Sequence, residues 1–274
     1  MTSVLNGTTV DLGPGVDGLN LANGDNVVTT AGVENINGFE GNNTVTFIGD
    51  GAVGQSISLN GSGTNVLNLA GSSGVFGMSI LGANLTVFGQ TTAAGGNEDV
   101  SLTNVQNGTT YDLGAGTNDS LHLFNDGTHI NVVMVRNVEN VVSVGDGSDQ
   151  IHIAGNSDAA TTVTSGARSD QIWASADVDH FRYAFTSDSS YDVPAGGQRD
   201  VVHDFNAAQD QFVFDHIVGA TSLNWQLIDF GGASIVRVDL NGDADPTGDT
   251  GWDMAIQLEN LTGTLTNSNF LLLT

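Results

Sequence analysis

The chain of 274 residues contains no cysteine and no lysine, and its only basic residues besides histidine are 5 arginines. Without cysteine it can form neither a disulfide framework nor a thiolate metal site. Clustered positive charge, which nucleic acids and anionic membrane surfaces require, is also missing. The composition therefore argues against both of these classes of partner.

Long apolar runs are absent as well. No stretch of about 18 apolar residues occurs, so we expect no membrane-spanning helix and no membrane insertion. The first residues, MTSVLNGTTVDLG, lack a basic segment followed by an apolar one. We therefore expect no Sec-type signal peptide, and export would need another route.

Familiar catalytic motifs are also missing. The sequence has no H-E-x-x-H, no G-x-S-x-G and no P-loop, and the lack of Lys and Cys removes further nucleophiles and bases. A carboxylate pair for glycoside cleavage stays open, although no pair stands out among the many aspartates. We expect the protein not to be an enzyme.

Acidic residues dominate the charge, because 31 Asp and Glu give a formal net charge of −26. Aspartate outnumbers glutamate by 26 to 5, which a need for solubility alone does not explain. A short carboxylate next to glycine suits tight turns and oxygen-ligand sites for hard cations. The composition therefore favours Ca²⁺ as the counter-charge.

Internal repeats indicate the fold. NGTTVDLGPGVDGLNL (6–21) returns as NGTTYDLGAGTNDSLHL (107–123), GVENINGFEGNNTVTF (32–47) returns more loosely at 137–153, and GSGTNVLNL (61–69) is a further copy. Each unit has a glycine turn, then Asp or Asn, then alternating apolar residues typical of a short strand. A unit this short cannot bury its own apolar face, so units must stack. We predict an all-β chain that forms a parallel β-solenoid or β-roll.

The sequence VGDGSDQIH (144–152) is the sharpest motif. Gly145 and Gly147 allow a turn that exposes carbonyl oxygens, Asp149 adds a carboxylate, and Ile151 points inward. This pattern resembles the calcium-binding nonapeptide G-G-x-G-x-D-x-U-x of RTX (repeats-in-toxin) proteins. SGARSDQIW (165–173) keeps Asp170, and ASADVDHFR (174–182) keeps Asp179, in more degenerate copies. In the first of these, Arg168 stands at a glycine position.

The last part of the chain extends the resemblance. RDVVHDFNAAQDQFVF (199–214) is similar to the segment that follows the repeats in the secretion domain of serralysin-type RTX exoproteins. The resemblance implies a further calcium site at Asp200, Asp204 and Asp210. It also implies an uncleaved C-terminal signal for a type I secretion system, with which the apolar ending TNSNFLLLT agrees.

Other candidate calcium ligands are less specific. Asp17 and Asp119 follow the glycine turns of the first repeat and its copy. DLNGDAD resembles the start of an EF-hand loop, with Asp239, Asn241 and Asp243 as candidate ligands, and a plain hairpin turn is the alternative. The histidines form no H-x-x-x-H pair, so transition-metal binding is not favoured.

We predict three regions: a degenerate repeat solenoid at 1–143, RTX-like β-roll repeats at 144–182, and a β-rich cap with the secretion signal at 183–274. The aromatic residues concentrated after about residue 180 are expected to form the core of this cap rather than a sugar-stacking platform.

The expected function is a secreted, calcium-dependent structural protein of the bacterial surface or extracellular matrix, such as an S-layer, filament or biofilm component. Copies of the chain would pair through the solenoid ends, and the type I secretion machinery and a cell-surface polysaccharide are further expected partners. Two alternatives stay open: a monomeric calcium-dependent glycan-binding adhesin, and a polysaccharide-modifying enzyme.

Overall fold

A computed structural model describes residues 6–48, 53–59, 63–71, 74–82, 84–90, 97–124, 127–143, 145, 147–156, 159–189, 199–230, 233–244 and 251–274. The chain divides into two compact units. Unit 1 comprises 1–124, 131–140 and 156–159, and unit 2 comprises 125–130, 141–155 and 160–274. The three regions predicted from the sequence stay predictions. Val144 and Asp146 of the sharpest motif lie outside the described residues.

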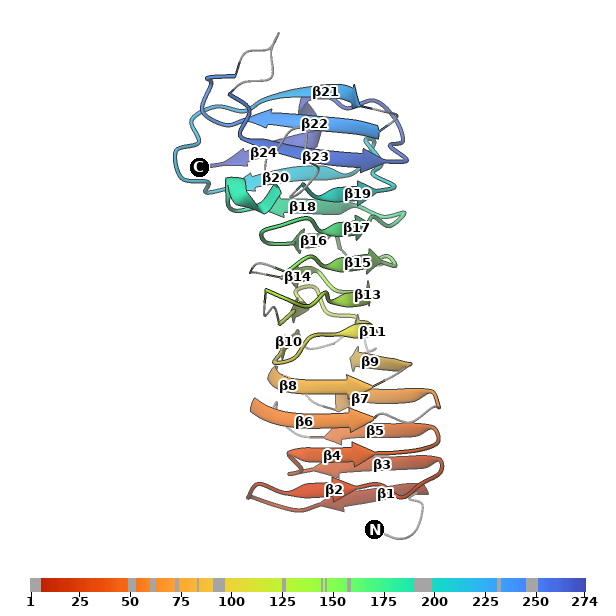
Figure 1. The fold of residues 1–274 in the computed structure, drawn as a ribbon. Coiled ribbons are helices and arrows are strands. Elements are labelled where there is room, and N and C mark those ends of the chain that lie inside the picture. Colours follow the sequence, from red (N-terminus) through yellow and green to blue (C-terminus); the bar gives the residue numbers. More distant parts are fainter. Residues whose placement is uncertain are drawn as a thin grey trace. The chain divides into compact units, whose positions relative to one another are not determined.

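Unit 1 consists of two parallel sheets whose strands alternate along the chain (Figure 1). The first sheet has the order β1 (Asn6–Asp11), β3 (Asn26–Ala31), β5 (Asn43–Ile48), β7 (Asn65–Gly71), β9 (Leu85–Gln90), β11 (Asn107–Gly114) and β13 (Val132–Arg136). The second has the order β2 (Gly18–Asn20), β4 (Asn35–Gly38), β6 (Val53–Leu59), β8 (Gly74–Gly82), β10 (Glu98–Leu102) and β12 (Ser120–His122). Strand β14 (Asn140–Val142) spans the division between the units.

Unit 2 repeats this alternation and then changes it. One sheet has the order β15 (Gln150–Ile153), β17 (Gln171–Trp173), β19 (Val201–His203), β23 (Met254–Glu259), β22 (Ala233–Asp239) and β21 (Asn224–Phe230). The other has the order β16 (Thr161–Thr164), β18 (Asp179–Tyr183), β20 (Gln211–Asp215) and β24 (Phe270–Leu273). Strands β21, β22 and β23 pair antiparallel, whereas the other pairs given for this unit are parallel.

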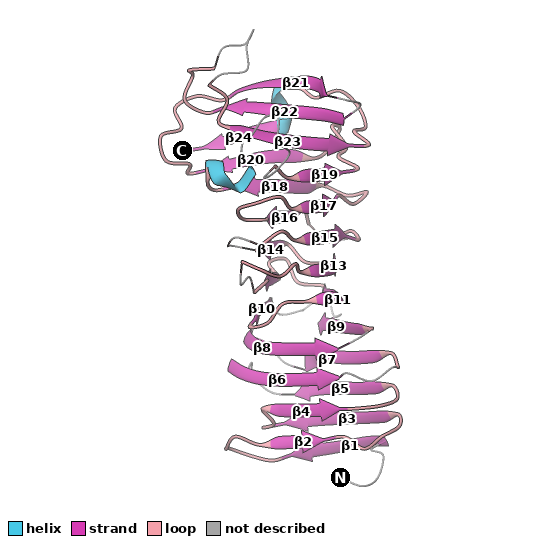
Figure 2. Cartoon of the chain, in the orientation of Figure 1, coloured by secondary structure: helices cyan, strands magenta, loops and turns pink. Residues whose placement is uncertain are grey.

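Strands dominate the described residues, and the two helices are short 3₁₀ turns, η1 (Thr186–Ser189) and η2 (Asn267–Asn269) (Figure 2). From β1 to β19, the chain leaves each sheet and returns to it next to the strand it left, which is the arrangement of a parallel β-solenoid. The predicted fold class is confirmed. In the part of the chain that the structure describes, no helix has the length and apolar character needed to cross a membrane.

Alternation of side chains produces the core. In β5 the buried residues Asn43, Val45 and Phe47 alternate with half-buried threonines, so every second residue enters the space between the two sheets. Turns bring successive coils close together. Gly41 has φ +86°, and a Cβ atom there would lie 2.4 Å from the backbone of Gly24, so this position requires glycine.

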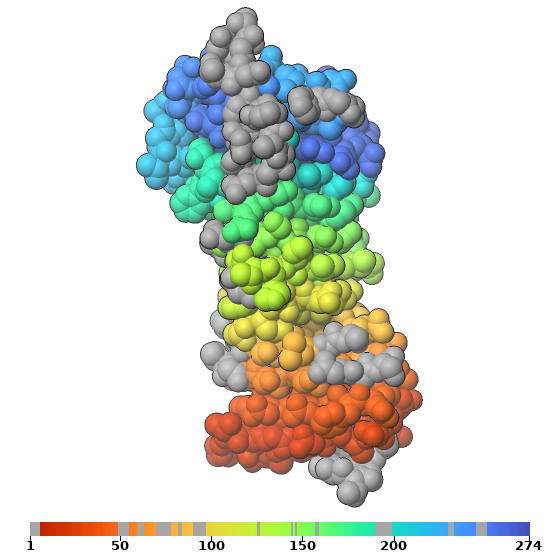
Figure 3. All heavy atoms as spheres, viewed as in Figure 1, coloured from red at the N-terminus to blue at the C-terminus, as the bar shows by residue number. Residues whose placement is uncertain are grey.

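Aromatic side chains fill the interior of unit 2, as expected for a cap core. Phe205 and Phe212 are fully buried and stack with ring centroids 4.6 Å apart, and Phe181 packs against both. In the space-filling view, residues from the cyan and blue parts of the chain lie side by side on the surface of this unit (Figure 3). The C-terminal third is therefore a packed part of the fold rather than an extended tail.

Candidate functional site: buried carboxyl ladders

Three aspartates occupy equivalent positions in successive coils of unit 2. Asp149, Asp170 and Asp200 each directly precede a strand of one sheet, β15, β17 and β19, and their exposed fractions are 1%, 0% and 0%. We call these three residues the inner carboxyl ladder. Parallel pairing places each strand start above the next, so the three carboxyl groups fall into one row.

Two carboxyl groups of this ladder accept hydrogen bonds from the backbone of the preceding ladder residue. The Asp149 amide donates to Asp170 Oδ1 at 2.6 Å, and the Asp170 amide donates to Asp200 Oδ1 at 2.9 Å. A carboxylate therefore caps the unpaired amide where the next strand begins. These hydrogen bonds, together with the pairing of the strands, fix the register between coils.

Serines supply further hydrogen bonds. Ser143 Oγ donates to Asp149 Oδ2, and Ser165 Oγ donates to Asp200 Oδ2 at 3.0 Å. The Asp200 amide donates to Ser189 Oγ at 2.9 Å, which closes the row. Among the described residues, Asp170 Oδ2 is buried and has no hydrogen-bond partner. This middle oxygen needs a proton or a cation.

Two further aspartates, Asp179 and Asp210, lie at the starts of the neighbouring strands β18 and β20 in the other sheet of unit 2. The Asp179 amide donates to Asp210 Oδ1 at 3.1 Å, and the Asn206 amide donates to Asp210 Oδ2 at 2.8 Å. Asp179 Oδ2 accepts from the amide and the hydroxyl of Ser175 at 2.6 and 3.0 Å. Its Oδ1 is buried without a hydrogen-bond partner in the described part of the chain.

Unit 1 contains similar hydrogen bonds between backbone amides and buried carboxyl groups, with glutamate as one of the partners. The Glu98 amide donates to Asp119 Oδ1 at 2.7 Å, and the Asp119 amide donates to Glu139 Oε2 at 2.6 Å. Asn156 Nδ2 donates to Glu139 Oε1 at 2.7 Å. In the earlier copy of this repeat, half-buried Asp17 donates its amide to Glu34 Oε2 at 2.8 Å. Here the glutamate, not Asp17, takes the acceptor role.

Asparagine replaces aspartate in an uncharged version of the ladder. Buried Asn26 donates its Nδ2 to Asn43 Oδ1 at 2.9 Å, and Asn43 Nδ2 donates to Asn65 Oδ1 at 3.2 Å. An amide both donates and accepts, whereas an ionised carboxylate only accepts. The aspartate ladders therefore carry a need for positive charge that the asparagine ladder does not have.

Burial raises the pKa values of five of these aspartates. Burial and the neighbouring Asp200 carboxylate raise the pKa of Asp170 to about 10, and burial raises that of Asp200 well above its usual range. Burial raises the pKa of Asp179 to about 7, and those of Asp119 and Asp210 to about 6. At neutral pH and without a cation, Asp170 therefore holds a proton.

Among the described residues, no three His, Asp or Glu side chains come together to hold a metal ion. The Gly145 carbonyl accepts a 2.9 Å hydrogen bond from the Ala167 amide of the next coil. A Cβ atom at Gly166 would lie 2.3 Å from the Ser143 carbonyl oxygen, so these turns are in direct contact. Gly147 is also buried. The carbonyl and carboxyl oxygens of this turn are ligands that a hard cation prefers, and their role as calcium ligands stays a prediction.

The secretion-domain motif is likewise divided. Asp200 belongs to the inner carboxyl ladder and Asp210 to the pair with Asp179. Asp204 is exposed, has φ +62° and accepts a 3.1 Å hydrogen bond from Asn260 Nδ2. The three aspartates thus serve three separate sets of hydrogen bonds, and their role as calcium ligands stays a prediction.

The DLNGDAD segment forms hydrogen bonds typical of a turn. Buried Asp239 Oδ1 accepts from the amides of Asn241 and Gly242 at 3.1 and 2.7 Å, and Asn241 Oδ1 accepts from the Asp243 amide at 2.9 Å. Burial opposes ionisation of Asp239, but its hydrogen bonds from Asn224 and these amides lower its pKa. This geometry agrees with the hairpin-turn alternative.

Several contributing residues were not predicted from the sequence: Glu98, Glu139, Ser143, Ser165, Asp188 and Tyr183. Asp188 Oδ2 accepts from the amides of Ala184 and Phe185, both at 2.9 Å. The Tyr183 hydroxyl is buried without a hydrogen-bond partner among the described residues, and its pKa is raised by burial and by the carboxylates of Asp200 and Asp170. A polar residue directly before each alternating strand is the signal that could have revealed the glutamates and aspartates.

Comparison with known proteins gives little further information. No family model and no curated protein matches the chain. One matching solved structure is the solution structure of the AlgE6R3 subunit from the Azotobacter vinelandii mannuronan C5-epimerase. It is 21% identical, covers 57% of this chain and 80% of its own, and aligns with a TM-score of 0.32. Membership in a family does not follow from these comparisons.

Proposed function

We propose that the protein is a secreted structural component of the bacterial cell surface or extracellular matrix, which assembles with copies of itself through the ends of its solenoid. The observation that carries this proposal is the edge formed by β21 and β24. Each is the last strand of its sheet in unit 2. Edge strands offer backbone groups to which another chain can add a strand.

Apolar side chains on these two edge strands support the proposal. Leu227 of β21 is 40% exposed, and Leu271 and Leu273 of β24 are 42% and 38% exposed. Proteins that stay monomeric usually protect an edge with charge, proline or a covering segment. Exposed leucines on two edge strands favour burial against another copy.

Calcium would act on this assembly through charge. A formal charge of −26 makes copies repel one another, and divalent cations both screen and neutralise such a surface. The buried carboxyl ladders add a second requirement, because Asp170, Asp179 and Asp119 each have an unpartnered oxygen in the described part of the chain. We propose that Ca²⁺ outside the cell supports folding and assembly, whereas its scarcity in the cytosol keeps the chain export-competent.

The proposal includes no catalysis. The ladder carboxyls are buried and hydrogen-bonded to backbone amides, so they are not presented to a substrate. The exposed aspartates are spread over both units. A polysaccharide lyase or epimerase would require a carboxylate that is exposed in a groove beside basic groups.

Light scattering and negative-stain microscopy of the full chain, with EGTA or with millimolar Ca²⁺, test the proposal. We expect monomers in EGTA and regular filaments or sheets in Ca²⁺. Circular dichroism under both conditions separates folding from assembly. A folded monomer at millimolar Ca²⁺ and high protein concentration contradicts the structural role and favours the monomeric adhesin.

A further inference from the structure

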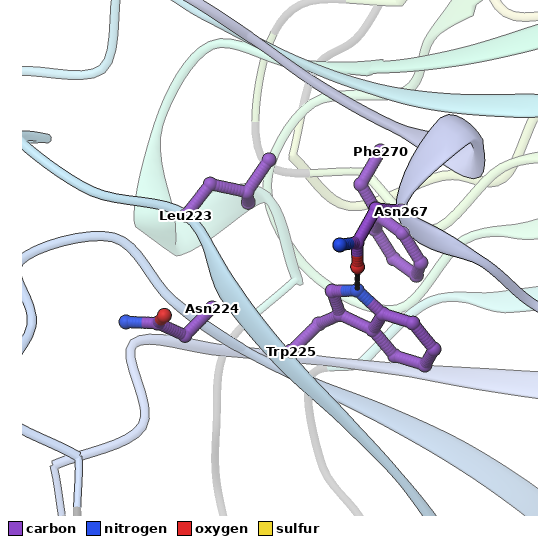
Figure 4. Close-up of a pocket in the computed structure, with 5 residues that line it drawn as sticks. All are labelled: Leu223, Asn224, Trp225, Asn267 and Phe270. Carbon is purple, nitrogen blue, oxygen red and sulfur yellow. Dashed lines mark hydrogen bonds between the residues drawn. The ribbon is translucent and has the colours of Figure 1, made fainter.

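A cavity of about 510 Å³ lies in unit 2 between the start of β21 and the segment formed by η2 and β24 (Figure 4). Leu223, Asn224, Trp225, Asn267 and Phe270 line it. Its volume falls within the range of about 300–1,000 Å³ that is typical of small-ligand sites. It contains none of the ladder carboxyls, so it is independent of the coil-stacking device.

Trp225 is held in one orientation at this cavity. Its indole ring stacks on Phe270 with centroids 4.5 Å apart and an interplanar angle of 18°. Its Nε1 donates a 2.9 Å hydrogen bond to Asn267 Oδ1 (Figure 4). A half-buried tryptophan fixed by both a ring contact and a hydrogen bond presents a pre-formed apolar surface.

The two asparagines offer complementary polar groups. Asn224 Nδ2 donates to Asp239 Oδ2 at 2.9 Å. Because burial of Asp239 is outweighed by its hydrogen bonds and its pKa is lowered, its carboxylate is ionised and accepts only. The nitrogen of Asn224 must therefore face Asp239, and its Oδ1 is left as an acceptor.

The same reasoning orients Asn267. The indole Nε1 of Trp225 can only donate, so it must face the oxygen of the Asn267 amide. The amide nitrogen of Asn267, an exposed residue, is left as a donor. The aromatic surface therefore lies beside one free, uncharged donor, whereas Asn224 points away from Trp225 and offers its acceptor on the other side of β21 (Figure 4).

We infer that this cavity binds an uncharged saccharide. A pyranose ring has an apolar C–H face that can lie on the indole while a hydroxyl accepts from Asn267 Nδ2, and a longer saccharide can extend to Asn224 Oδ1. The formal charge of −26 disfavours uronates and other anionic sugars. This inference goes beyond the proposed structural role, because it gives the assembled protein a glycan to which it attaches.

Calorimetric titration of the full chain in millimolar Ca²⁺ tests the site. The probes are methyl glucopyranoside, methyl galactopyranoside, methyl N-acetylglucosaminide and their β-1,4-linked disaccharides, with glucuronate as the anionic comparison. We expect saturable binding of at least one neutral probe, weaker binding of glucuronate, and a change in tryptophan fluorescence on binding. Absence of saturable binding for every neutral probe would overturn the inference.

Variants locate the binding. Trp225→Ala should weaken binding by about tenfold or more, which corresponds to about 1.4 kcal/mol. Asn224→Ala and Trp225→Phe should weaken sugar binding less. Both variants keep an aromatic ring against Phe270, so they test the site even where Trp225→Ala does not fold. Trp173→Ala on β17 is the matched control and should bind normally. Equal affinity of wild-type protein and all Trp225 and Asn224 variants would place the sugar elsewhere and overturn the inference, whether or not the protein assembles.

Discussion

The backbone amide of Asp149 donates a 2.6 Å hydrogen bond to the carboxyl oxygen Oδ1 of Asp170 in the next coil. This contact joins two residues that the repeat motif would assign to separate calcium-binding turns. It uses one oxygen of Asp170 and leaves the other buried and unpartnered among the described residues. Stacking of the coils is therefore linked to the protonation or cation binding of aspartate.

Replacing Asp170 by Asn distinguishes these two sources of positive charge. The Asn oxygen can still accept from the Asp149 amide, while its NH₂ group removes the need for a proton, as in the Asn26–Asn43–Asn65 ladder. We expect Asp170→Asn to raise the free energy of unfolding at pH 8 in EGTA by about 1–3 kcal/mol.

Urea unfolding measures this difference, with exposed Asp25→Asn as a control that should change little. If Asp170 is instead an essential calcium ligand, the variant loses stability in Ca²⁺ and binds the ion less tightly.

Stability of the calcium-free protein should fall as pH rises. The pKa values of Asp119 and Asp210 are raised to about 6 and that of Asp179 to about 7, from 3.8. The folded state then binds more protons than the unfolded state between pH 4 and 7, so its stability is full below pH 4 and is lost through pH 6–7. His152 and His180, whose pKa values burial lowers, oppose this trend below pH 6.5.

Unfolding free energies measured from pH 5 to 8 in EGTA should therefore decrease, because the raised carboxyls outnumber these histidines. Millimolar Ca²⁺ should flatten the profile if the cation replaces the proton. A calcium-free profile that rises over this range would contradict the effect assigned to the carboxyl ladders.

Asp204 tests the calcium site implied by the secretion-domain resemblance. Asp204→Ala should lower calcium affinity if the exposed carboxylate is a ligand. The same change also places alanine at φ +62°, which costs about 1–2 kcal/mol of stability.

Asp204→Gly separates the two effects, because glycine removes the carboxylate without the backbone strain. Calorimetry with Ca²⁺ should show both variants equally weakened, while only Asp204→Ala loses stability in EGTA. Unchanged affinity in both variants would remove Asp204 from the list of ligands.

Local patterns predicted much of the fold. Alternation placed Leu19, Leu121 and Ile151 inside, and all three are buried. Arg168, at a glycine position of the motif, adopts the left-handed conformation that the turn requires, with φ +82°. These features depend on neighbours in sequence, which a repeat pattern records directly.

The carboxyl ladders could not be predicted in the same way. Their hydrogen bonds join residues about 20 to 30 positions apart, such as Asp119 with Glu139 and Asp170 with Asp200. Which glutamate meets which aspartate depends on the register between coils and on the lengths of the intervening turns. A single sequence shows that Asp precedes the strands β15, β17 and β19, but it does not show that the side chain turns to an amide of the neighbouring coil.

The edge leucines provide the last prediction, on assembly. Leu227→Glu and Leu271→Glu place charge on β21 and β24, whose outer edges would pair with another copy. Each variant should fold with Ca²⁺ but remain monomeric in light scattering, because the leucines are already exposed in the single chain. Leu81→Glu on β8 is the matched control and should still assemble, because this leucine is 47% exposed but lies on a strand with neighbours on both sides.

Deletion of residues 2–12 removes β1, the first strand of the other unit, and should also prevent growth if copies pair head to tail. Assembly that continues in both edge variants would show that β21 and β24 are not the contact, and assembly that continues only in the deletion would indicate a closed dimer through the C-terminal edges.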